Sequence, residues 1–336
     1  MTVTAPKGFR AAGITAGLKS SGTPDLALVV NDGPSCAAAA VFTSNRFKAA
    51  PVLWTEQVVK DGRVRAVVLN SGGANCGTGP EGFQTTHATA ERTAELLGIG
   101  AVDVAVCSTG LIGVPLPRDV VLRGVETAHA ALGTDGGADA ARAVMTTDSV
   151  PKIASYDGAG FTVGGMAKGA GMLAPALATM LVVLTTDADV DADTCDRALR
   201  AATRTTFDRL DSDGCQSTND TVVLLASGAS GTAPDATAFA AVVQAVCADL
   251  AQQLLRDAEG SEHDIAIEVV GAASEADALE VGRSVARSNL FKCAVFGEDP
   301  NWGRVLASVG TTNATFDVFA VDVHFNGVQV CRAGTQ

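Results

Sequence analysis

One hydroxyl interrupts an otherwise apolar segment that follows a glycine-rich loop. Residues 176–184 read ALATMLVVL, with Thr179 as the polar member, and a KGAG motif at 168–171 and Pro175 precede it. A β-branched threonine in a short apolar run bounded by turn residues is typical of a buried strand. Alternatively, Thr179 is a nucleophile that becomes a chain terminus when the Ala178–Thr179 bond is cut. The local pattern alone favours the structural interpretation.

A threonine at a new chain terminus would carry its own general base. The four histidines are dispersed, and the sequence has no G-x-S-x-G elbow. An acyl-transfer mechanism would therefore need a base other than histidine. The α-amine of a terminal threonine has an ordinary pKa of about 7.7–8.0, so it can accept the hydroxyl proton near neutral pH. Pairing a threonine with its terminal amine is an established way to activate this weak nucleophile.

Two polar loops follow predicted strands. Residues 107–113 read CSTGLIG. A hydroxyl and backbone N–H groups at a strand end suit an oxyanion hole, although the pattern alone favours an N-cap and turn before the helix at Pro117. Residues 70–79 read NSGGANCGTG, which fits a phosphate loop, a tight loop near a small polar ligand, or a plain turn.

Three further blocks admit a structural and a functional interpretation. MTTDSVPK at 145–152 and STNDT at 217–221 are dense in small hydroxyl and amide side chains. Such clusters can bind an amino acid, but turns use the same residues. DPNWGR at 299–304 is favoured as a structural corner that packs an indole.

The composition excludes several classes of partner. The 336 residues carry a net charge of −13, are 47% hydrophobic and contain no Lys/Arg cluster, which argues against nucleic acid and anionic membranes. The longest nearly apolar run, 172–184, is too short to span a bilayer. Eight scattered cysteines without a C-x-x-C pair indicate free thiols, and no zinc-ligand spacing occurs. Without a visible signal sequence, we expect a cytoplasmic protein.

Strand-like and helix-like stretches alternate along the whole chain, which predicts an α/β or α+β fold. The N-cap of the helix after the acidic turn at 187–194 is expected at Asp193 or Thr194. The run 315–325 alternates in its second half, so Phe319, Val321, Val323 and Phe325 should share one face of a strand. Predicted strands cover 26–31, 37–43, 66–70, 103–108, 180–185, 221–226, 265–271 and 315–325, and predicted helices cover 87–97, 117–131, 138–145, 195–203, 235–257 and 275–288.

Eight blocks occur in the order found in one enzyme family. KGAGMLAPALATML strongly resembles the cleavage-site signature of the ornithine acetyltransferases, the self-cleaving glutamate N-acetyltransferases of arginine biosynthesis. The other seven blocks are AAAAVFTSNRFKAAPV at 37–52, NSGGAN at 70–75, STGLIG at 108–113, MTTDSVPK at 145–152, STNDT at 217–221, AEG at 258–260 and GEDPNWGR at 297–304. The resemblance covers essentially the whole chain and reverses the preference for a structural Thr179.

The resemblance implies both a fold and a division of the chain. The fold would be the layered α/β architecture that this family shares with self-cleaving aminopeptidases. Cleavage between Ala178 and Thr179 would give an α chain, 1–178, and a β chain, 179–336, which usually assemble as α2β2 in the cytoplasm. The family normally continues for several dozen residues beyond the point where this sequence ends, into a segment that supplies an Asn and a Ser or Thr to the substrate site.

The resemblance also implies roles for individual residues. Thr179 would be the nucleophile, and Thr109 and Gly110 match the oxyanion hole. The substrate-binding positions are matched by Thr146, Lys168, Thr179 and Glu259. The implied reaction is a ping-pong acetyl transfer from N2-acetyl-ornithine to glutamate through an acetyl-Thr179 ester, which needs no metal or organic cofactor.

Other functions stay open at this level. A related self-processing aminopeptidase or amidase would use the same nucleophile but pass the acyl group to water. A non-catalytic relative would stay uncut and act only in binding or assembly. The sequence leaves open whether acetyl-CoA is a second acetyl donor.

Overall fold

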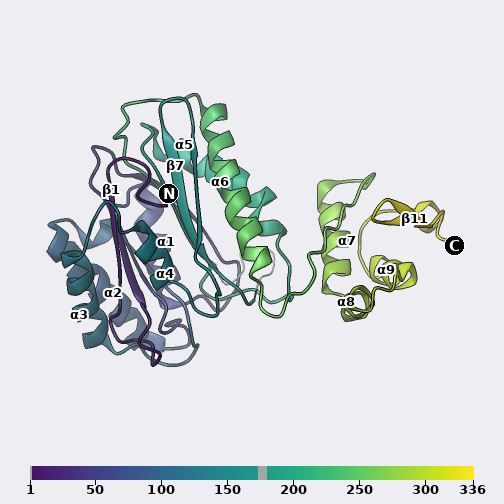
Figure 1. Ribbon diagram of the computed structural model, residues 1–336, viewed down its shortest axis with the longest axis horizontal. Helices are drawn as coiled ribbons and strands as arrows, with labels where there is room; N and C mark the ends of the chain where they lie inside the picture. The colour runs from purple at the N-terminus through teal and green to yellow at the C-terminus, as the bar shows by residue number, and fades with distance from the viewer. Residues whose placement is uncertain (1, 173–179) are drawn as a thin grey trace. The chain divides into compact units, whose positions relative to one another are not determined.

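The computed structural model describes residues 2–172 and 180–336, and the chain divides into two compact units (Figure 1). The predicted cleavage residues Ala178 and Thr179 lie outside the described residues. The larger unit comprises Met1–Leu210 and Cys215–Gly260, and the smaller comprises Asp211–Gly214 and Ser261–Gln336. The predicted division at Thr179 concerns a covalent cut and stays a prediction.

Two sheets form the centre of the larger unit. The four-stranded sheet has the order β1-β2-β4-β5, and the five-stranded sheet has the order β3-β9-β8-β7-β6. The β4–β5 and β8–β9 pairs are parallel, and the other neighbours are antiparallel. The strands are β1 Phe9–Ile14, β2 Leu26–Asn31, β3 Ala37–Phe42, β4 Ala66–Asn70, β5 Val104–Ser108, β6 Lys152–Asp157, β7 Thr162–Lys168, β8 Leu181–Thr186 and β9 Thr221–Ala226.

Helices cover the outer face of each sheet, which gives a layer order of helix, sheet, sheet, helix. Helices α2 and α3 pack on the four-stranded sheet, and α5 and α6 pack on the five-stranded sheet (Figure 1). Helix α1 packs beside β5, and α4 packs on β1 and β2. The helices are α1 Ala50–Val58, α2 Gly79–Leu97, α3 Arg118–Ala130, α4 Gly137–Ala143, α5 Ala192–Thr205 and α6 Ala236–Arg256.

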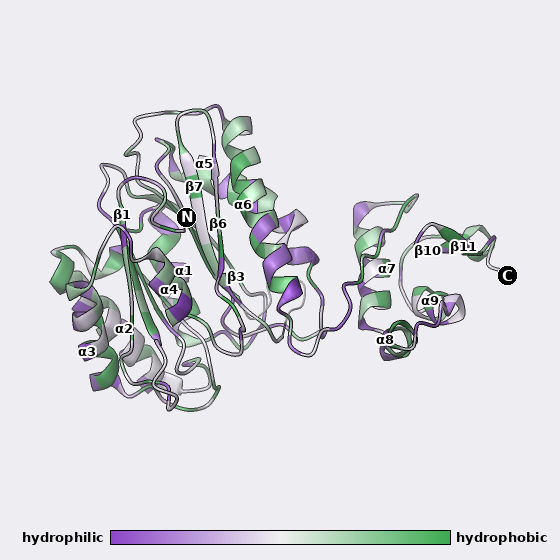
Figure 2. Ribbon diagram, viewed as in Figure 1, coloured by the Kyte–Doolittle hydropathy of each residue, from purple (hydrophilic) through white to green (hydrophobic). Residues whose placement is uncertain are grey.

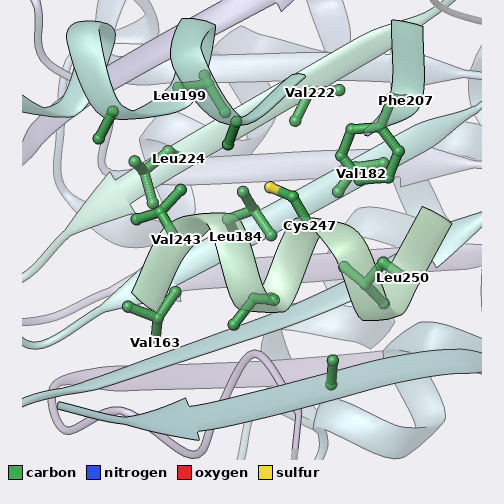
Figure 3. Packing of buried hydrophobic residues seen from close by; sticks show 14 of the residues in the cluster. Val163, Val182, Leu184, Leu199, Phe207, Val222, Leu224, Val243, Cys247 and Leu250 are labelled. Atoms are coloured by element: carbon green, nitrogen blue, oxygen red, sulfur yellow. The ribbon is translucent and has the colours of Figure 1, made fainter. Parts of the chain in front are cut away.

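The central strands are apolar along their whole length because both of their faces are covered. In β8, Leu181 and Val183 point into the core between the two sheets. Val182 and Leu184 point into the core under α5 and α6, where Figure 3 shows them packed against Cys247 of α6. This explains why the sequence shows continuous apolar runs here instead of the alternation of a half-exposed strand.

Helix α6 is long and apolar enough to pass a test for a membrane span. On one of its faces, Val243, Cys247 and Leu250 lie buried against the five-stranded sheet (Figure 3), and Phe239 belongs to the same buried cluster. Figure 2 shows both apolar and hydrophilic residues along the helix. We therefore interpret α6 as an amphipathic core helix, whose apolar stripe is matched by the sheet that it covers.

The smaller unit has a small core of its own. Val285, Phe291 and Val309 are buried together, with Phe325 packed against them. Its elements are α7 Glu275–Arg287, α8 Asn289–Phe296, α9 Trp302–Val309, β10 Val323–Phe325 and β11 Val328–Cys331, and the two strands pair as an antiparallel hairpin.

The structure corrects the predicted strands of this unit. Residues 265–271 form no strand, and Ile265 and Val270 are exposed. Within 315–325 only Val323–Phe325 is a strand, and Phe319 lies exposed in a 3₁₀ turn, so the predicted apolar face does not form. Alternation produces a strand only where a partner ladder and a covering layer exist.

Two smaller predictions also change. The N-cap of α5 is Asp191, whose carboxylate accepts the Thr194 N–H, and not Asp193 or Thr194. The helix begins at Ala192, so these two residues already lie in its first turn. The DPNWGR block starts α9, with the Asn301 side chain accepting the Arg304 N–H as its cap.

Candidate active site

The predicted oxyanion residues lie where β5 ends. Thr109 is buried and donates its backbone N–H to Asn70 O at 2.9 Å. Gly110 has φ +130°, and a Cβ there would lie 2.7 Å from the backbone nitrogen of Gly73. Only glycine fits this turn without strain. Within residues 2–172 and 180–336 no acceptor is bonded to the Gly110 N–H, so this donor is available to a developing oxyanion.

Lys168 joins the oxyanion turn to the five-stranded sheet. It is the last residue of β7, its side chain is 1% exposed, and its Nζ donates to Thr109 Oγ1 at 3.3 Å. Burial lowers the pKa of its ammonium to about 8, and the charge of Asp148, whose Oδ2 lies 4.0 Å away, opposes that fall. Lys168 is therefore a cation with few fixed partners, suited to a carboxylate ligand.

Asp148 organises the polar groups around Lys168. Its Oδ1 accepts from Lys152 Nζ at 2.5 Å and from the Gly169 N–H at 2.7 Å. Burial alone would raise the pKa of the Asp148 carboxyl, but Lys168 and Lys152 together hold it below its ordinary value. Lys152 is itself fully buried and also pairs with Asp257, which ties the start of β6 to the end of α6.

The predicted substrate residues Thr146 and Glu259 belong to the same network. Thr146 donates its backbone N–H to Asp148 Oδ2 at 2.9 Å. Glu259 donates its N–H to Ala170 O at 2.8 Å, two residues beyond Lys168. Gly171 allows the Glu259 carboxylate to come close, because a Cβ at Gly171 would lie 2.8 Å from Glu259 Oε2.

The STNDT block at 217–221, which leads into β9, binds the backbone of the loops at the site. Asn219 donates its amide to Ala74 O at 2.6 Å and to Ser108 O at 2.7 Å. It therefore ties the glycine-rich loop after β4 to the end of β5. The next residue, Asp220, is fully buried, and its Oδ1 accepts the backbone N–H of Met180 at 3.1 Å.

The structure thus brings the described site predictions together, and it adds residues that the sequence did not single out. Thr109, Gly110, Thr146, Lys168 and Glu259 are linked through Asp148 and the KGAG backbone. The roles of Asp148, Lys152, Asn219, Asp220 and Asp257 were missed. The signal was present in four of them, since each is a charged or amide residue inside a block of small polar residues.

The arrangement can hold an amino acid and stabilise a negative charge on an acyl oxygen. A glycine N–H without an acceptor among the described residues, a threonine hydroxyl and a buried lysine lie at one place, and a carboxylate lies close by along the chain. This site, on two stacked sheets covered by helices, defines an acyl-transfer enzyme.

The model of the ArgJ family matches residues 10–336. The chain belongs to the ArgJ family, and it is an acyltransferase of arginine biosynthesis.

Relatives named "Arginine biosynthesis bifunctional protein ArgJ" match nearly the whole chain. The Streptomyces coelicolor protein is 66% identical, with 99% of this chain and 87% of the relative covered. The Thermobifida fusca protein is 62% identical, with 100% and 88% covered. A solved chain of ornithine acetyltransferase complexed with ornithine, from Mycobacterium tuberculosis, is 56% identical with a TM-score of 0.50, and the match covers 54% of this chain and 96% of that one. The predicted family and fold class are confirmed.

Proposed function

We propose that this chain transfers an acetyl group from N2-acetyl-ornithine to glutamate through an ester on Thr179. The observation that carries the proposal is the 3.3 Å contact between Lys168 Nζ and Thr109 Oγ1. It joins a carboxylate-binding cation to the predicted oxyanion turn, at the edge where β8 begins two residues after Thr179. The ornithine in the solved relative supports the substrate class.

The proposed mechanism has two half-reactions. Thr179 Oγ attacks the acetyl carbonyl while the α-amine of Thr179 accepts the hydroxyl proton. The Gly110 N–H and Thr109 stabilise the oxyanion, ornithine leaves, and glutamate then takes the acetyl group by the reverse steps. Lys168 binds the α-carboxylate of each substrate and Glu259 binds the ammonium. The word "bifunctional" in the relatives' names supports acetyl-CoA as a second donor.

The proposal includes cleavage of the chain at Ala178–Thr179. The match to the solved relative covers almost all of that chain but only 54% of this one. That share of 336 residues is about 181, close to the 178 residues before Thr179. This length supports an α chain, 1–178, and a β chain, 179–336. We extend the proposal to α2β2 assembly in the cytoplasm.

Mass measurement and N-terminal sequencing test the proposal. Wild-type protein should give two chains, one beginning Thr-Met-Leu-Val-Val, and N2-acetyl-ornithine without glutamate should add one acetyl group to it. Thr179→Ala should stay uncut and inactive, whereas Thr179→Ser should keep both reactions at a reduced rate. An uncut wild-type chain with full transfer activity would refute the nucleophile, and an uncut inactive chain would favour a non-catalytic relative.

A further inference from the structure

The peptide group that joins Ser108 to Thr109 is held at both of its polar atoms. Its N–H, which belongs to Thr109, donates to Asn70 O at 2.9 Å. Its carbonyl, which belongs to Ser108, accepts from Asn219 Nδ2 at 2.7 Å. A planar peptide group bonded on both edges cannot rotate without losing a hydrogen bond. The next peptide group carries the Gly110 N–H that is proposed for the oxyanion, so the direction of this N–H is set from a fixed plane.

The same amide of Asn219 also holds the loop beside this turn. Asn219 Nδ2 donates to Ala74 O at 2.6 Å, while Asn70 Nδ2 donates to Gly73 O at 3.0 Å. The turn lies directly against this loop, because a Cβ at Gly110 would lie 2.7 Å from Gly73 N. One side chain from the segment before β9 therefore fixes both the end of β5 and the loop that packs against it.

Further hydrogen bonds hold Asn219 itself in place. The residue is buried, and its Oδ1 accepts from Thr218 Oγ1 at 2.6 Å, which turns the donor end of the amide toward the two carbonyls. The Asn219 N–H donates to Ser217 Oγ at 3.1 Å, and Ser217 O accepts from Thr43 Oγ1 at 2.7 Å, just beyond the end of β3. A side chain locked by packing and supporting hydrogen bonds can hold a site group precisely.

Asn31 makes the same kind of contact at the opposite end of β9. It is also buried, and its Nδ2 donates to Ser35 O at 3.1 Å and to Ala226 O, in the last residue of β9, at 3.2 Å. Its Oδ1 accepts the Gly33 N–H at 3.0 Å. None of these partners belongs to the candidate site. Comparing the two asparagines therefore separates a contribution to stability from a contribution to the site.

We infer that Asn219 is a positioning residue that directs the Gly110 N–H toward the oxyanion, an inference that rests on the function proposed above. By bridging Ser108 O and Ala74 O, Asn219 keeps the oxyanion turn from rotating when negative charge develops on the acyl oxygen. Donors that are already aimed at this charge need no reorganisation during the reaction, which is why they lower its barrier. Asn219 acts only through the backbone of the turn.

The test compares Asn219→Ala with Asn31→Ala. Each variant removes an amide that donates to two buried carbonyls, so both should unfold at a lower urea concentration than wild type. In Asn219→Ala, kcat for acetyl transfer from N2-acetyl-ornithine to glutamate should fall about 10- to 100-fold. Both KM values should stay within about twofold of wild type, because an interaction used only in the transition state lowers kcat alone. Rates are expressed per cut chain, as measured by mass.

In Asn31→Ala, kcat should stay within about twofold of wild type. Two results would overturn the inference. One is a wild-type kcat in Asn219→Ala, and the other is an equal loss of kcat in Asn31→Ala, which would attribute the loss to stability. A wild-type chain that transfers no acetyl group would instead refute the proposed function.

Asn219→Ser provides the test if Asn219→Ala does not fold. Serine has a single O–H donor on a shorter side chain, so it can hold one of the two carbonyls but cannot bridge them. Its kcat should fall about fivefold or more, again with both KM values unchanged. A wild-type kcat in Asn219→Ser would show that the bridge does not direct the Gly110 N–H.

Discussion

The two ends of the parallel β8–β9 pair differ in how completely a buried carboxyl group is hydrogen-bonded. At the end where the strands finish, Asp187 accepts the Thr162 N–H at 2.7 Å and the Lys7 N–H at 3.1 Å. At the end where they begin, Asp220 Oδ2 has no hydrogen-bond partner in the part of the chain that the structure describes. Both carboxyl groups are nearly or fully buried. Burial alone therefore does not determine whether a carboxyl is satisfied: Asp187 has a donor for each oxygen, and Asp220 does not among the described residues.

The same contrast separates two buried lysines on adjacent strands. Lys152 of β6 is paired with Asp148 and Asp257. Among the described residues, Lys168 of β7 has a hydrogen bond to the Thr109 hydroxyl and a carboxylate at 4.0 Å, and burial lowers its pKa to about 8. Both side chains bear the desolvation cost of a buried cation, but only Lys152 recovers it through close partners. This difference supports the proposal that Lys168 binds the substrate carboxylate.

The largest effect on activity is expected from Gly110→Ala. The new Cβ would lie 2.7 Å from Gly73 N, and φ is +130°. The turn must shift, which misdirects the Gly110 N–H, and loss of one oxyanion donor typically lowers kcat by about 10²–10³. Steady-state acetyl transfer measures this effect.

Gly231→Ala is the control for Gly110→Ala. Gly231 also has a positive φ, +69°, but a Cβ there meets nothing within 4 Å. It should lose stability only, by about 1 kcal/mol. Equal losses of activity in the two variants would mean that the Gly110 turn does not stabilise the oxyanion.

Lys168→Met should separate stability from function. The folded pKa of about 8 lies below the ordinary 10.5. Between these values the unfolded chain binds more protons, so the free energy of unfolding rises with pH across that window. Below pH 8 the buried charge costs up to about 3 kcal/mol, as 1.36 kcal/mol per pKa unit implies. The variant should therefore unfold at a higher denaturant concentration at pH 7, with little gain at pH 10.5.

The same variant should lose substrate binding. The proposed carboxylate contact is shared by both substrates, so KM should rise for N2-acetyl-ornithine and for glutamate together. Stability curves at pH 7 and 10.5 and the two KM values are the measurements. If the variant were less stable at pH 7 and both KM values were unchanged, Lys168 would stabilise the fold and would not bind the substrates.

Much of the larger unit could be predicted from the sequence, for a definite physical reason. Strands covered on both faces give continuous apolar runs, as in β2, β8 and β9, and these runs were recognised. The strand β7 was missed because it contains Gly164 and Gly165, which usually weaken a strand. A Cβ at Gly164 would lie 2.2 Å from Thr2 O, so this glycine is required by a close approach that no local pattern reveals.

The site was predicted through the order of its blocks and not through its contacts. Thr109, Lys168 and Glu259 are far apart in the sequence, and the connecting Asp148 carries no signature of its own. The orphan oxygen of Asp220 became visible only with the fold, because it depends on what is absent around a buried atom. In the smaller unit the alternating residues 315–325 misled prediction, since nothing covers Phe319 there.

The smallest effect on activity is expected from Asp187→Asn, which tests the structural end of the strand pair. The amide keeps one acceptor, but its NH₂ group would face a backbone N–H that now has no partner. Such a buried mismatch costs about 1–3 kcal/mol. The midpoint of urea unfolding should fall accordingly, while kcat/KM for acetyl transfer stays within about twofold of wild type.

This outcome would sharpen the comparison of the two ends. Asp220→Asn should show the reverse pattern in stability, with no loss at pH 7, because a carboxyl with a raised pKa destabilises the fold as pH rises above its ordinary value. If Asp187→Asn instead lost acetyl transfer at unchanged stability, the two ends would not differ in function. Hydrogen-bond satisfaction would then be a poor guide to the site in this fold.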